Sequence, residues 1–473
     1  MDVEQGAART GLVTLVLVGA TFLAGLDLFV VNVAFDEIGR DFTSGANPPS
    51  LSDLSWILTA YAVVYAALLV PLGRLADRYG RKNAFVLGLS LFAASSLACS
   101  LSDGVWVLVA FRAAQAVGAA AMTPASLGLL VAALPPEGRA PAARLWALTG
   151  AVAAALGPAF GGLLVELSWQ WAFLVNVPIS LALVLAAIRF VPDVRHDGAG
   201  APRPDLLGAV VLTVAVGGLV LGLVQGNEWG WASAGALTAF GVAAGSLVGF
   251  CLLSTWHPSP VIDPALLRIR SFVLANVATL FFNIGFGASL LGGILWMQQA
   301  WGYSAVTTGI AVSAGPVAVP VTAFLVAKRF PSARPGMLVV WGSVVAAISG
   351  TWMSLTLTED PSYATTFLPP WLVMGVGVGL AFPNLVAAAT ATLPADQMST
   401  GSGVVSMARQ LGIVLGVSIL VSIVGTSIAD ESTFRPVFWL VAGASLLAAV
   451  AARAMASSPG PWRPDRRQPM PSS

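Results

Sequence analysis

The sequence predicts an all-α integral membrane protein with fourteen transmembrane helices, arranged as two six-helix bundles and a two-helix central insert. Composition is the first reason: of 473 residues, 57% are hydrophobic and 10% are charged, against about 25% charged residues in soluble domains. The second is a series of apolar runs, roughly 18–28 residues long, without the alternation of membrane β-strands. The third is the distribution of basic residues, which fall almost entirely on one side of these runs.

The N-terminal bundle, residues 1–190, is predicted from six apolar runs, near 12–34, 54–73, 84–101, 105–131, 142–165 and 171–190. Polar linkers and two inserted helices occupy residues 191–271, with the helices near 206–226 and 232–253. The C-terminal bundle, residues 272–456, contains the last six runs, near 272–297, 306–327, 336–356, 366–391, 401–428 and 433–454. The tail, 457–473, is rich in Pro and Arg and is predicted to be disordered and cytoplasmic.

The basic residues test this arrangement. With a cytoplasmic N-terminus, all but four of the 23 Lys and Arg lie on the cytoplasmic side. Arg40 and Arg435 lie outside, and Arg112 and Arg409 fall within helices. The positive-inside rule therefore predicts a multi-pass protein of the cell membrane with both termini in the cytoplasm. An odd helix count would destroy this asymmetry, whereas a twelve-helix protein without the two inserted helices would keep it.

Charge, cysteines and motifs exclude several classes of function. The net charge of +1 offers no basic surface for nucleic acid. Cys99 and Cys251 lie in apolar runs, so we expect packing roles and neither a disulfide nor a metal site. A phosphate-binding loop needs G-x-x-x-x-G-K-[ST], and neither Lys82 nor Lys328 occupies one. We therefore expect no use of ATP, no metal and no cofactor, so that an ion gradient would supply the energy for any work the protein does; we also expect a monomer.

Three ionisable residues lie well inside the predicted spans, where charges are costly and usually functional. Asp27 and Arg112 each lie about seven residues from the outer end of their helices, and therefore ~10 Å below the outer surface. Equal depth permits an ion pair, and a carboxylate there can exchange its proton as its access to water changes. We predict that this pair couples transport to protons; the alternative is a pair that only locks two helices together. Arg409 has no obvious acidic partner and is either structural or in contact with substrate.

The connection between the second and third helices carries the strongest motif, Gly73-Arg-Leu-Ala-Asp77-Arg78-Tyr-Gly80-Arg81-Lys82. Gly73 allows close helix approach, Gly80 permits a tight turn, and Asp77 can pair with arginines or cap a helix. The segment resembles, at every specified position, the G-x-L-a-D-r-x-G-r-k loop of the major facilitator superfamily. The resemblance implies a cytoplasmic latch between the two halves; the alternative is an anchor that only sets topology.

The first helix reads Leu-Asp27-Leu-Phe29-Val-Val-Asn32-Val-Ala-Phe-Asp36. It resembles the LDxTVxNVALP pattern of the fourteen-helix drug:proton antiporters in that superfamily. Phe29 and Asp36 stand where the pattern has Thr and Pro, so the end of this helix is expected to differ. The stretch 169–178 also resembles the junction between the fifth and sixth helices of that branch, although an interfacial aromatic belt gives the same pattern.

Two further helices resemble the same branch. Arg112-xx-Gln115 in the fourth helix is similar to its R-x-x-Q-G-x-G motif, which implies that the arginine is tied to proton transfer. The fifth helix is similar to the antiporter motif G-x-x-x-G-P-x-x-G-G, with alanine for its first glycine; the matching residues are Gly157, Pro158, Gly161 and Gly162. The pair Gly412 and Gly416 in the fifth helix of the C-terminal bundle repeats the spacing and suggests an internal repeat.

The resemblance implies the major facilitator fold and alternating access about a midplane site. It implies proton-driven export of a small hydrophobic or amphipathic compound, such as a drug, antibiotic or secondary metabolite, across the cytoplasmic membrane. The main alternative is a proton-coupled importer of a small organic nutrient. A membrane-embedded enzyme would need a cluster of His, Asp or Cys in the membrane, where only Asp27 is available. A passive channel is disfavoured by the two unequal halves.

The substrate cavity is expected to be apolar, with a few polar groups. Polar and aromatic candidates occupy the middle of helices: Asn32, Tyr61, Tyr65, Gln115, Asn276, Asn283, Trp296, Gln298, Asn384, Arg409 and Gln410. One acid stands against two arginines within the membrane. We therefore predict a neutral, zwitterionic or anionic cargo.

Overall fold

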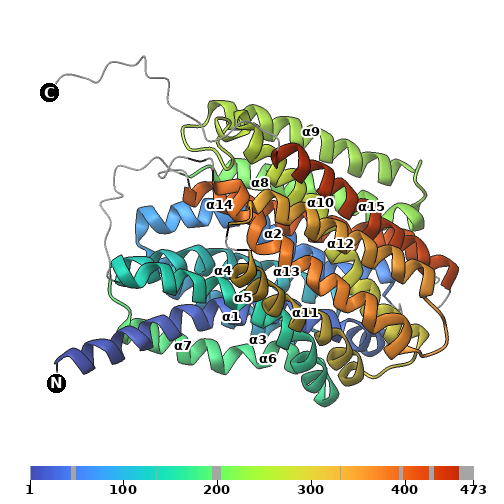
Figure 1. The fold of residues 1–473 in the computed structure, drawn as a ribbon, viewed down its shortest axis with the longest axis horizontal. Coiled ribbons are helices and arrows are strands. Elements are labelled where there is room, and N and C mark those ends of the chain that lie inside the picture. Colours follow the sequence, from blue (N-terminus) through green and yellow to red (C-terminus); the bar gives the residue numbers. More distant parts are fainter. Residues whose placement is uncertain are drawn as a thin grey trace.

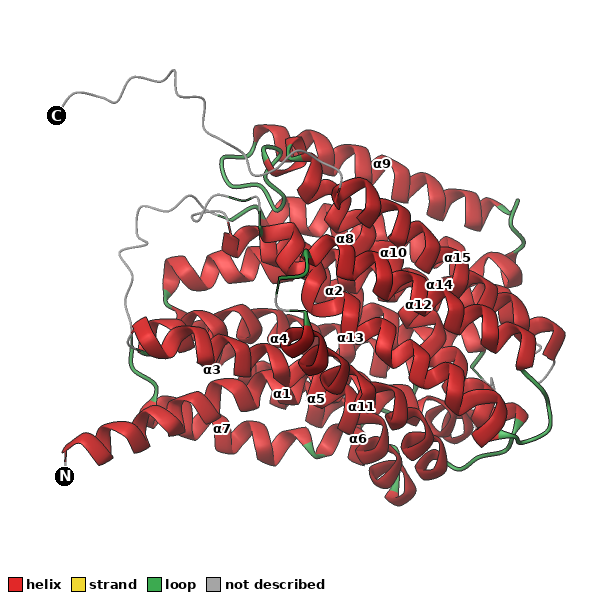
Figure 2. Cartoon of the chain, viewed as in Figure 1, coloured by secondary structure: helices red, strands yellow, loops and turns green. Residues whose placement is uncertain are grey.

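The computed structural model describes residues 2–43, 49–134, 136–193, 204–330, 332–391, 393, 398–425 and 431–456, and this part of the chain contains helices and no strand (Figure 2). The N-terminal half comprises α1 (Asp2–Thr43), α2 (Leu51–Tyr79), α3 (Arg81–Ser100), α4 (Val105–Ala133), α5 (Pro136–Leu167), α6 (Trp171–Leu174) and α7 (Asn176–Phe190). The insert comprises α8 (Leu206–Trp229) and α9 (Ala234–Trp256). The predicted disordered tail lies outside the described residues.

The C-terminal half follows a short 3₁₀ turn, Leu266–Arg268. Its helices are α10 (Arg270–Leu295), which continues as the π-helical turn η3 (Trp296–Ala300), α11 (Ala305–Arg329), α12 (Pro335–Thr356), α13 (Leu368–Thr390), α14 (Met398–Val424) and α15 (Glu431–Ala456). A second π-helical turn, Tyr363–Phe367, leads into α13. The helices lie side by side along one direction, with α1 beginning and α15 ending near the same end of the bundle (Figure 1). We call this the terminal end and the opposite one the far end.

The fourteen predicted spans are confirmed. Among the described residues, thirteen helical segments are long and apolar enough to cross a membrane, with α6 and α7 counted as one. The apolar part of α5, Val152–Leu167, belongs to a 32-residue helix and supplies the fourteenth. The twelve-helix alternative is wrong, because α8 and α9 are full-length spans of 24 and 23 residues. Several helices extend beyond their apolar runs, since the polar ends of a span continue the helix into the interface.

Corresponding helices of the two halves pack alike. Gly88 of α3 and Gly118 of α4 are so close that a Cβ on either would lie 2.8 or 2.6 Å from the carbonyl oxygen of the other. Gly342 of α12 and Gly377 of α13 make the same reciprocal contact, at 2.7 and 2.8 Å. These are the third and fourth helices of each half, and small residues are what allow their backbones to touch.

The halves meet along two seams, α5 against α11 and α2 against α14, and α8 lies against both helices of the second seam. Ser52 Oγ of α2 donates to Val224 O of α8 at 3.1 Å. Asn227 Nδ2 of α8 donates to Ser422 O of α14. The insert is therefore hydrogen-bonded to both halves near the far end.

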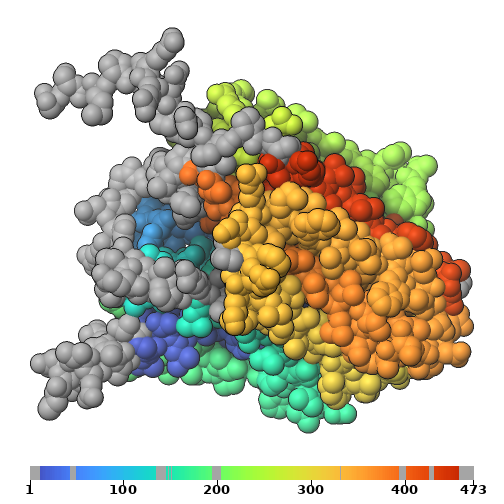
Figure 3. All heavy atoms as spheres, viewed as in Figure 1, coloured from blue at the N-terminus to red at the C-terminus, as the bar shows by residue number. Residues whose placement is uncertain are grey.

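The far end is closed. Every residue of α10 and η3 from Phe282 to Gln298 is buried, whereas the beginning of α10 is partly exposed. Gln298 Nε2 donates to Val33 O of α1 at 3.2 Å, and Gln299 Nε2 donates to Asp36 Oδ1 at 3.2 Å. At the terminal end, Figure 3 shows a hollow between the N-terminal half and the orange helices of the C-terminal half. Among the described residues, the far end is thus sealed and the terminal end is hollowed.

Candidate functional site

Asp27 of α1 and Arg112 of α4 form a buried ion pair, as their equal depth predicted. Arg112 Nη1 lies 2.6 Å from Asp27 Oδ2, and both side chains have 0% exposure to solvent. Taking either charge out of water costs several kcal/mol unless the other accompanies it. Each residue therefore fixes the other in place, and α1 and α4 are tied together at this depth.

Two amides complete the shell around the Asp27 carboxylate. Gln115 Nε2 donates to Asp27 Oδ1 at 3.0 Å, and Asn176 Nδ2 donates to the same oxygen at 2.8 Å. Gln115 also accepts from Arg112 Nη1 at 2.5 Å and donates to Ser96 Oγ at 2.7 Å. Four helices, α1, α3, α4 and α7, are joined through one carboxylate and one amide. A proton arriving on Asp27 would disturb all of these contacts together.

Arg112 is held on three further sides. Its Nε donates to Ile57 O of α2 at 3.2 Å. Its guanidinium carbon lies 4.1 Å from the centre of the Tyr61 ring and 5.7 Å from that of Phe173. Both distances fall within the range of cation–π attraction. Its Nη2 has no hydrogen-bond partner in the described part of the chain, so one donor of the buried cation is left over.

Asn176 is a partner of Asp27 that the sequence did not predict, because the stretch 169–178 also fits a helix junction or an aromatic belt. Trp169 in this stretch is buried, and its Nε1 donates to Asp41 Oδ2 of α1 at 2.6 Å. Asn176 itself lies where the chain restarts as α7 after a break at Val175, and it is 1% exposed. Its depth in the span, similar to that of Asp27, was the signal that could have identified it.

Most contacts of the motif between α2 and α3 lie within the N-terminal half, but Arg74 Nη1 donates to Ser259 Oγ at 2.9 Å and to Pro260 O at 2.5 Å, in the linker before α10. Arg81 Nε lies 2.6 Å from Asp77 Oδ1, and Arg81 Nη1 donates to Gly128 O of α4 at 3.1 Å. Gly80 ends α2 with φ +110°, a conformation that favours glycine. A Cβ on Gly73 would lie 3.2 Å from Pro124 Cβ, so this glycine does permit the close approach of α2 and α4.

Other basic residues of this motif contact backbone and aromatic groups. The Arg78 guanidinium lies 5.5 Å from the centre of the Tyr79 ring. Lys82 Nζ donates to Ile188 O and Val191 O, at 3.0 and 2.7 Å, and so satisfies carbonyls at the end of α7. Lysines suit the C-terminal end of a helix for this reason. A latch that reaches the C-terminal half stays a prediction.

The glycine motif of α5 faces two helices at once. A Cβ on Gly157 would lie 2.5 Å from Phe29 Cβ, and one on Gly161 would lie 3.0 Å from Val30 Cα, so both pack on α1. A Cβ on Gly162 would lie 2.6 Å from Ala305 O of α11. Pro158 lies against Gly309, also on α11. The motif therefore closes the seam between the two halves near the far end.

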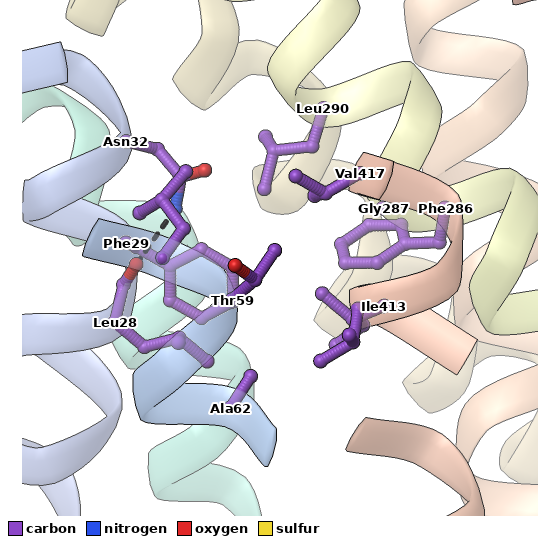
Figure 4. Close-up of a pocket in the computed structure, with 12 residues that line it drawn as sticks. Leu28, Phe29, Asn32, Thr59, Ala62, Phe286, Gly287, Leu290, Ile413 and Val417 are labelled. Carbon is purple, nitrogen blue, oxygen red and sulfur yellow. Dashed lines mark hydrogen bonds between the residues drawn. The ribbon is translucent and has the colours of Figure 1, made fainter. Parts of the chain in front are cut away.

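A small cavity lies between the halves at mid-depth (Figure 4). One wall comes from α1 and α2 and the other from α10 and α14; the lining residues are Leu28, Phe29, Asn32, Leu58, Thr59, Ala62, Phe286, Gly287, Leu290, Ile413, Val414 and Val417. Its volume is ≈ 30 Å³, room for water but far below the ~300–1,000 Å³ of a ligand pocket. In this state the two walls are nearly closed on each other.

The predicted cavity residues fall into different places. Asn32 lines the cavity and donates to Leu28 O at 2.7 Å. Tyr61 and Tyr65 are stacked, with ring centres 6.0 Å apart. Gln115 belongs to the Asp27 shell, and Gln298 to the far-end seal.

The remaining candidates lie in the C-terminal half. Asn283 is buried beside Gly412 at the contact of α10 with α14, and Trp296 is buried with its ring centre 5.1 Å from that of Phe434. Two half-buried amides donate to carbonyls one turn back in their own helices, from Asn276 to Phe272 O and from Asn384 to Leu380 O. Gln410 is buried, with its Oε1 unpaired in the described part of the chain. Arg409 is exposed. Thr59 and the apolar lining were not singled out from the sequence.

Known proteins similar to this chain are transporters or resistance proteins. The Multidrug resistance protein Stp of Mycobacterium tuberculosis is 31% identical over 421 residues, which cover 88% of this chain and 76% of Stp. The Multidrug export protein EmrB of Haemophilus influenzae is 32% identical over 422 residues, which cover 88% of this chain and 80% of EmrB. The Methylenomycin A resistance protein of Bacillus subtilis is 29% identical and covers 88% of each chain.

Solved structures share the fold at low sequence identity. A POT family transporter in complex with 5-aminolevulinic acid aligns with a TM-score of 0.69 at 13% identity, over 94% of this chain and 96% of that one. A bacterial homolog of the human lysosomal transporter Spinster, in an inward-facing conformation, aligns with a TM-score of 0.64 at 15% identity, over 97% and 99%. Residues 17–417 match the Major Facilitator Superfamily. The motif between α2 and α3, the fourteen spans and this match agree, and the chain belongs to the Major Facilitator Superfamily.

Proposed function

We propose that this protein exports a small hydrophobic or amphipathic compound from the cytoplasm, driven by protons that pass through Asp27. It acts as a monomeric secondary transporter of the cell membrane, without ATP or a cofactor. The carrying observation is the buried Asp27–Arg112 pair with its amide shell. The names of its relatives, which include multidrug resistance and export proteins, support the direction of transport.

The terminal end faces the cytoplasm in this proposal. Among the described residues, it carries most of the basic side chains, in agreement with the positive-inside rule. The hollow at this end then opens to the cytoplasm, and the sealed far end faces outward. The structure corresponds to the state that takes up cargo from inside the cell.

The ion pair is placed to act on both the cavity and the seal, because all three share α1. Phe29 and Asn32 of α1 line the cavity, Phe29 packs against Gly157 of α5, and Val33 accepts the bond from Gln298 at the far end. Two unit charges about 4 Å apart attract by about 4 kcal/mol at the effective dielectric of a protein. Protonation of Asp27 removes this attraction and frees α1 to move relative to α4. A proton from outside thus drives the exchange between the two states.

The loop from Gly73 to Lys82 takes part in the same exchange. Asp77 pairs with Arg81 in the present state. When the terminal end closes, this acid approaches the C-terminal half and holds it. The variant Asp77→Asn is expected to slow turnover without loss of substrate binding; unchanged turnover would reject the latch.

The test uses Asp27→Asn, which keeps the shape of the side chain and removes its charge. The matched control is Asp103→Asn, in the exposed turn between α3 and α4. An efflux-deficient host is challenged with a panel of antibiotics and dyes, with and without an uncoupler. Compounds that are exported are then followed in inverted and right-side-out vesicles.

Asp27→Asn is expected to abolish uncoupler-sensitive export while expression is retained, and Asp103→Asn to export as the parent does. Export by Asp27→Asn at the parental rate would contradict the proton role. Proton-driven accumulation in right-side-out vesicles, instead of inverted ones, would identify an importer.

A further inference from the structure

Arg409 lies near the middle of α14, on the face that is turned toward the interior of the molecule. It is eleven residues from the start of the helix at Met398, or about 16 Å along its axis. Residues three and four positions later share its face. Gly412 packs on Asn283 of α10, and Ile413 lines the central cavity. The Arg409 side chain therefore projects toward the interior of the molecule, and it is nevertheless exposed. It belongs to the wall of the hollow that opens at the terminal end.

No acid compensates this arginine. In the described part of the chain, Arg409 makes no ion pair or hydrogen bond, and the only ionisable group that influences it is Tyr65 of α2, across the seam. Asp27 is the one acid in the middle of a described span, and its charge is already matched by Arg112. Among the described residues, Arg409 is therefore a positive charge without an acidic partner in this hollow.

A chain of stacked groups connects this charge to the proton site. Tyr65 stacks on Tyr61, with the ring planes 7° apart. Tyr61 in turn lies against the guanidinium of Arg112, at 4.1 Å. Tyr65, the group that acts electrostatically on Arg409, is thus joined to the Asp27–Arg112 pair through the Tyr61 ring.

We propose that Arg409 is the binding site for an anionic group on the exported compound. The group is a carboxylate or another acidic oxygen, because a guanidinium binds these through charge-assisted hydrogen bonds. The apolar body of the compound lies one helical turn farther in, toward Ile413 and Phe286, where the central cavity begins. The cargo is therefore an amphipathic anion. This inference rests on the proposed export function and specifies its substrate class.

The test measures binding without a proton gradient, so that it is independent of transport. Purified protein in lipid nanodiscs is titrated calorimetrically with naphthylacetate, its uncharged amide naphthylacetamide, and the cation naphthylethylammonium. The variants are Arg409→Gln, Arg409→Lys, which retains the charge, and Arg334→Gln as control. Arg334 is an exposed arginine at the terminal end.

The parent and Arg334→Gln are expected to bind naphthylacetate about 10- to 100-fold more tightly than the amide, the range for a hydrogen bond to a charged group. Arg409→Gln is expected to lower this ratio to about one-fold, because only the amide-like contacts remain. Arg409→Lys should keep most of the preference. Three results would overturn the inference: an unchanged ratio in Arg409→Gln, tightest binding of the cation, or no binding of naphthylacetate to the parent.

The two proposals fail in different ways. If the parent binds naphthylacetate no more tightly than the amide but still shows proton-driven export that depends on Asp27, the proposed substrate class is wrong and the export function stands. A clear anion preference that depends on Arg409, without any proton-driven export, refutes the proposed export function alone.

Discussion

Replacing Gly162 by alanine should open the far end of the molecule. A Cβ at this position would lie 2.6 Å from Ala305 O and 2.8 Å from Val306 Cα. Both neighbours are backbone atoms, so no side chain can rotate away and α5 must move off α11. Overpacking of this kind costs about 1–3 kcal/mol. The cost falls only on the state in which the seam is closed, so the ratio of open to closed molecules should rise about 5- to 150-fold.

The opening can be measured at Gln298, which is 4% exposed in the sealed state. Gln298→Cys is introduced after Cys99 and Cys251 have been replaced by alanine, and its labelling by a membrane-impermeant maleimide is timed in intact cells. The control is Gly150→Ala on the same helix, where an added Cβ meets nothing within 4 Å. Labelling should accelerate with Gly162→Ala and not with Gly150→Ala. Equal labelling rates in parent and Gly162→Ala would refute the argument.

Four other substitutions test contacts of the N-terminal half. Arg112→Gln and Asp27→Asn should each lower the free energy of unfolding by about 3–5 kcal/mol, and the double variant by less than their sum; simple additivity in denaturant titrations would contradict a coupled pair. Asn176→Ala removes one charge-assisted hydrogen bond from Asp27 and should lower the free energy of unfolding by about 1.5–3 kcal/mol in the same titrations. An unchanged free energy of unfolding would show that the bond does not stabilise the protein. Gly80→Ala forces alanine into φ +110°, at a cost of about 1–3 kcal/mol. Gly104→Ala, which has negative φ and open space, should be tolerated.

The sequence was sufficient for the helices and for the ion pair. Apolar length marks a span regardless of its neighbours, so all fourteen were found, and the depth of Asp27 and Arg112 could be counted in residues. Helix ends were less well predicted, and α1 runs from Asp2 to Thr43 where the apolar run ends near residue 34. The polar residues at that end continue the helix because backbone hydrogen bonding does not require apolar side chains.

The lining of the central cavity could not be predicted in the same way. Lipid tails and protein interiors are equally apolar, so a membrane helix shows little difference between the face that meets lipid and the face that meets another helix. The sequence therefore could not show whether a polar side chain in a span points to the cavity, to another helix or to lipid. Asn32 does line the cavity, whereas Gln115 is hydrogen-bonded to Asp27 and Gln298 to the backbone of α1. Asn176 was passed over because its neighbours suggested an interface.

The position of α8 has a consequence for compounds dissolved in the bilayer. Its hydrogen bonds with Ser52 of α2 and, through Asn227, with α14 hold it over the junction of α2 with α14. In the described part of the chain neither inserted helix packs closely on α5 or α11, and residues 321–329 of α11 are exposed or half-buried. Among the described helices, the α5–α11 junction is therefore the one that faces the surroundings without an inserted helix over it, and we expect a molecule that enters sideways from the inner leaflet to pass there.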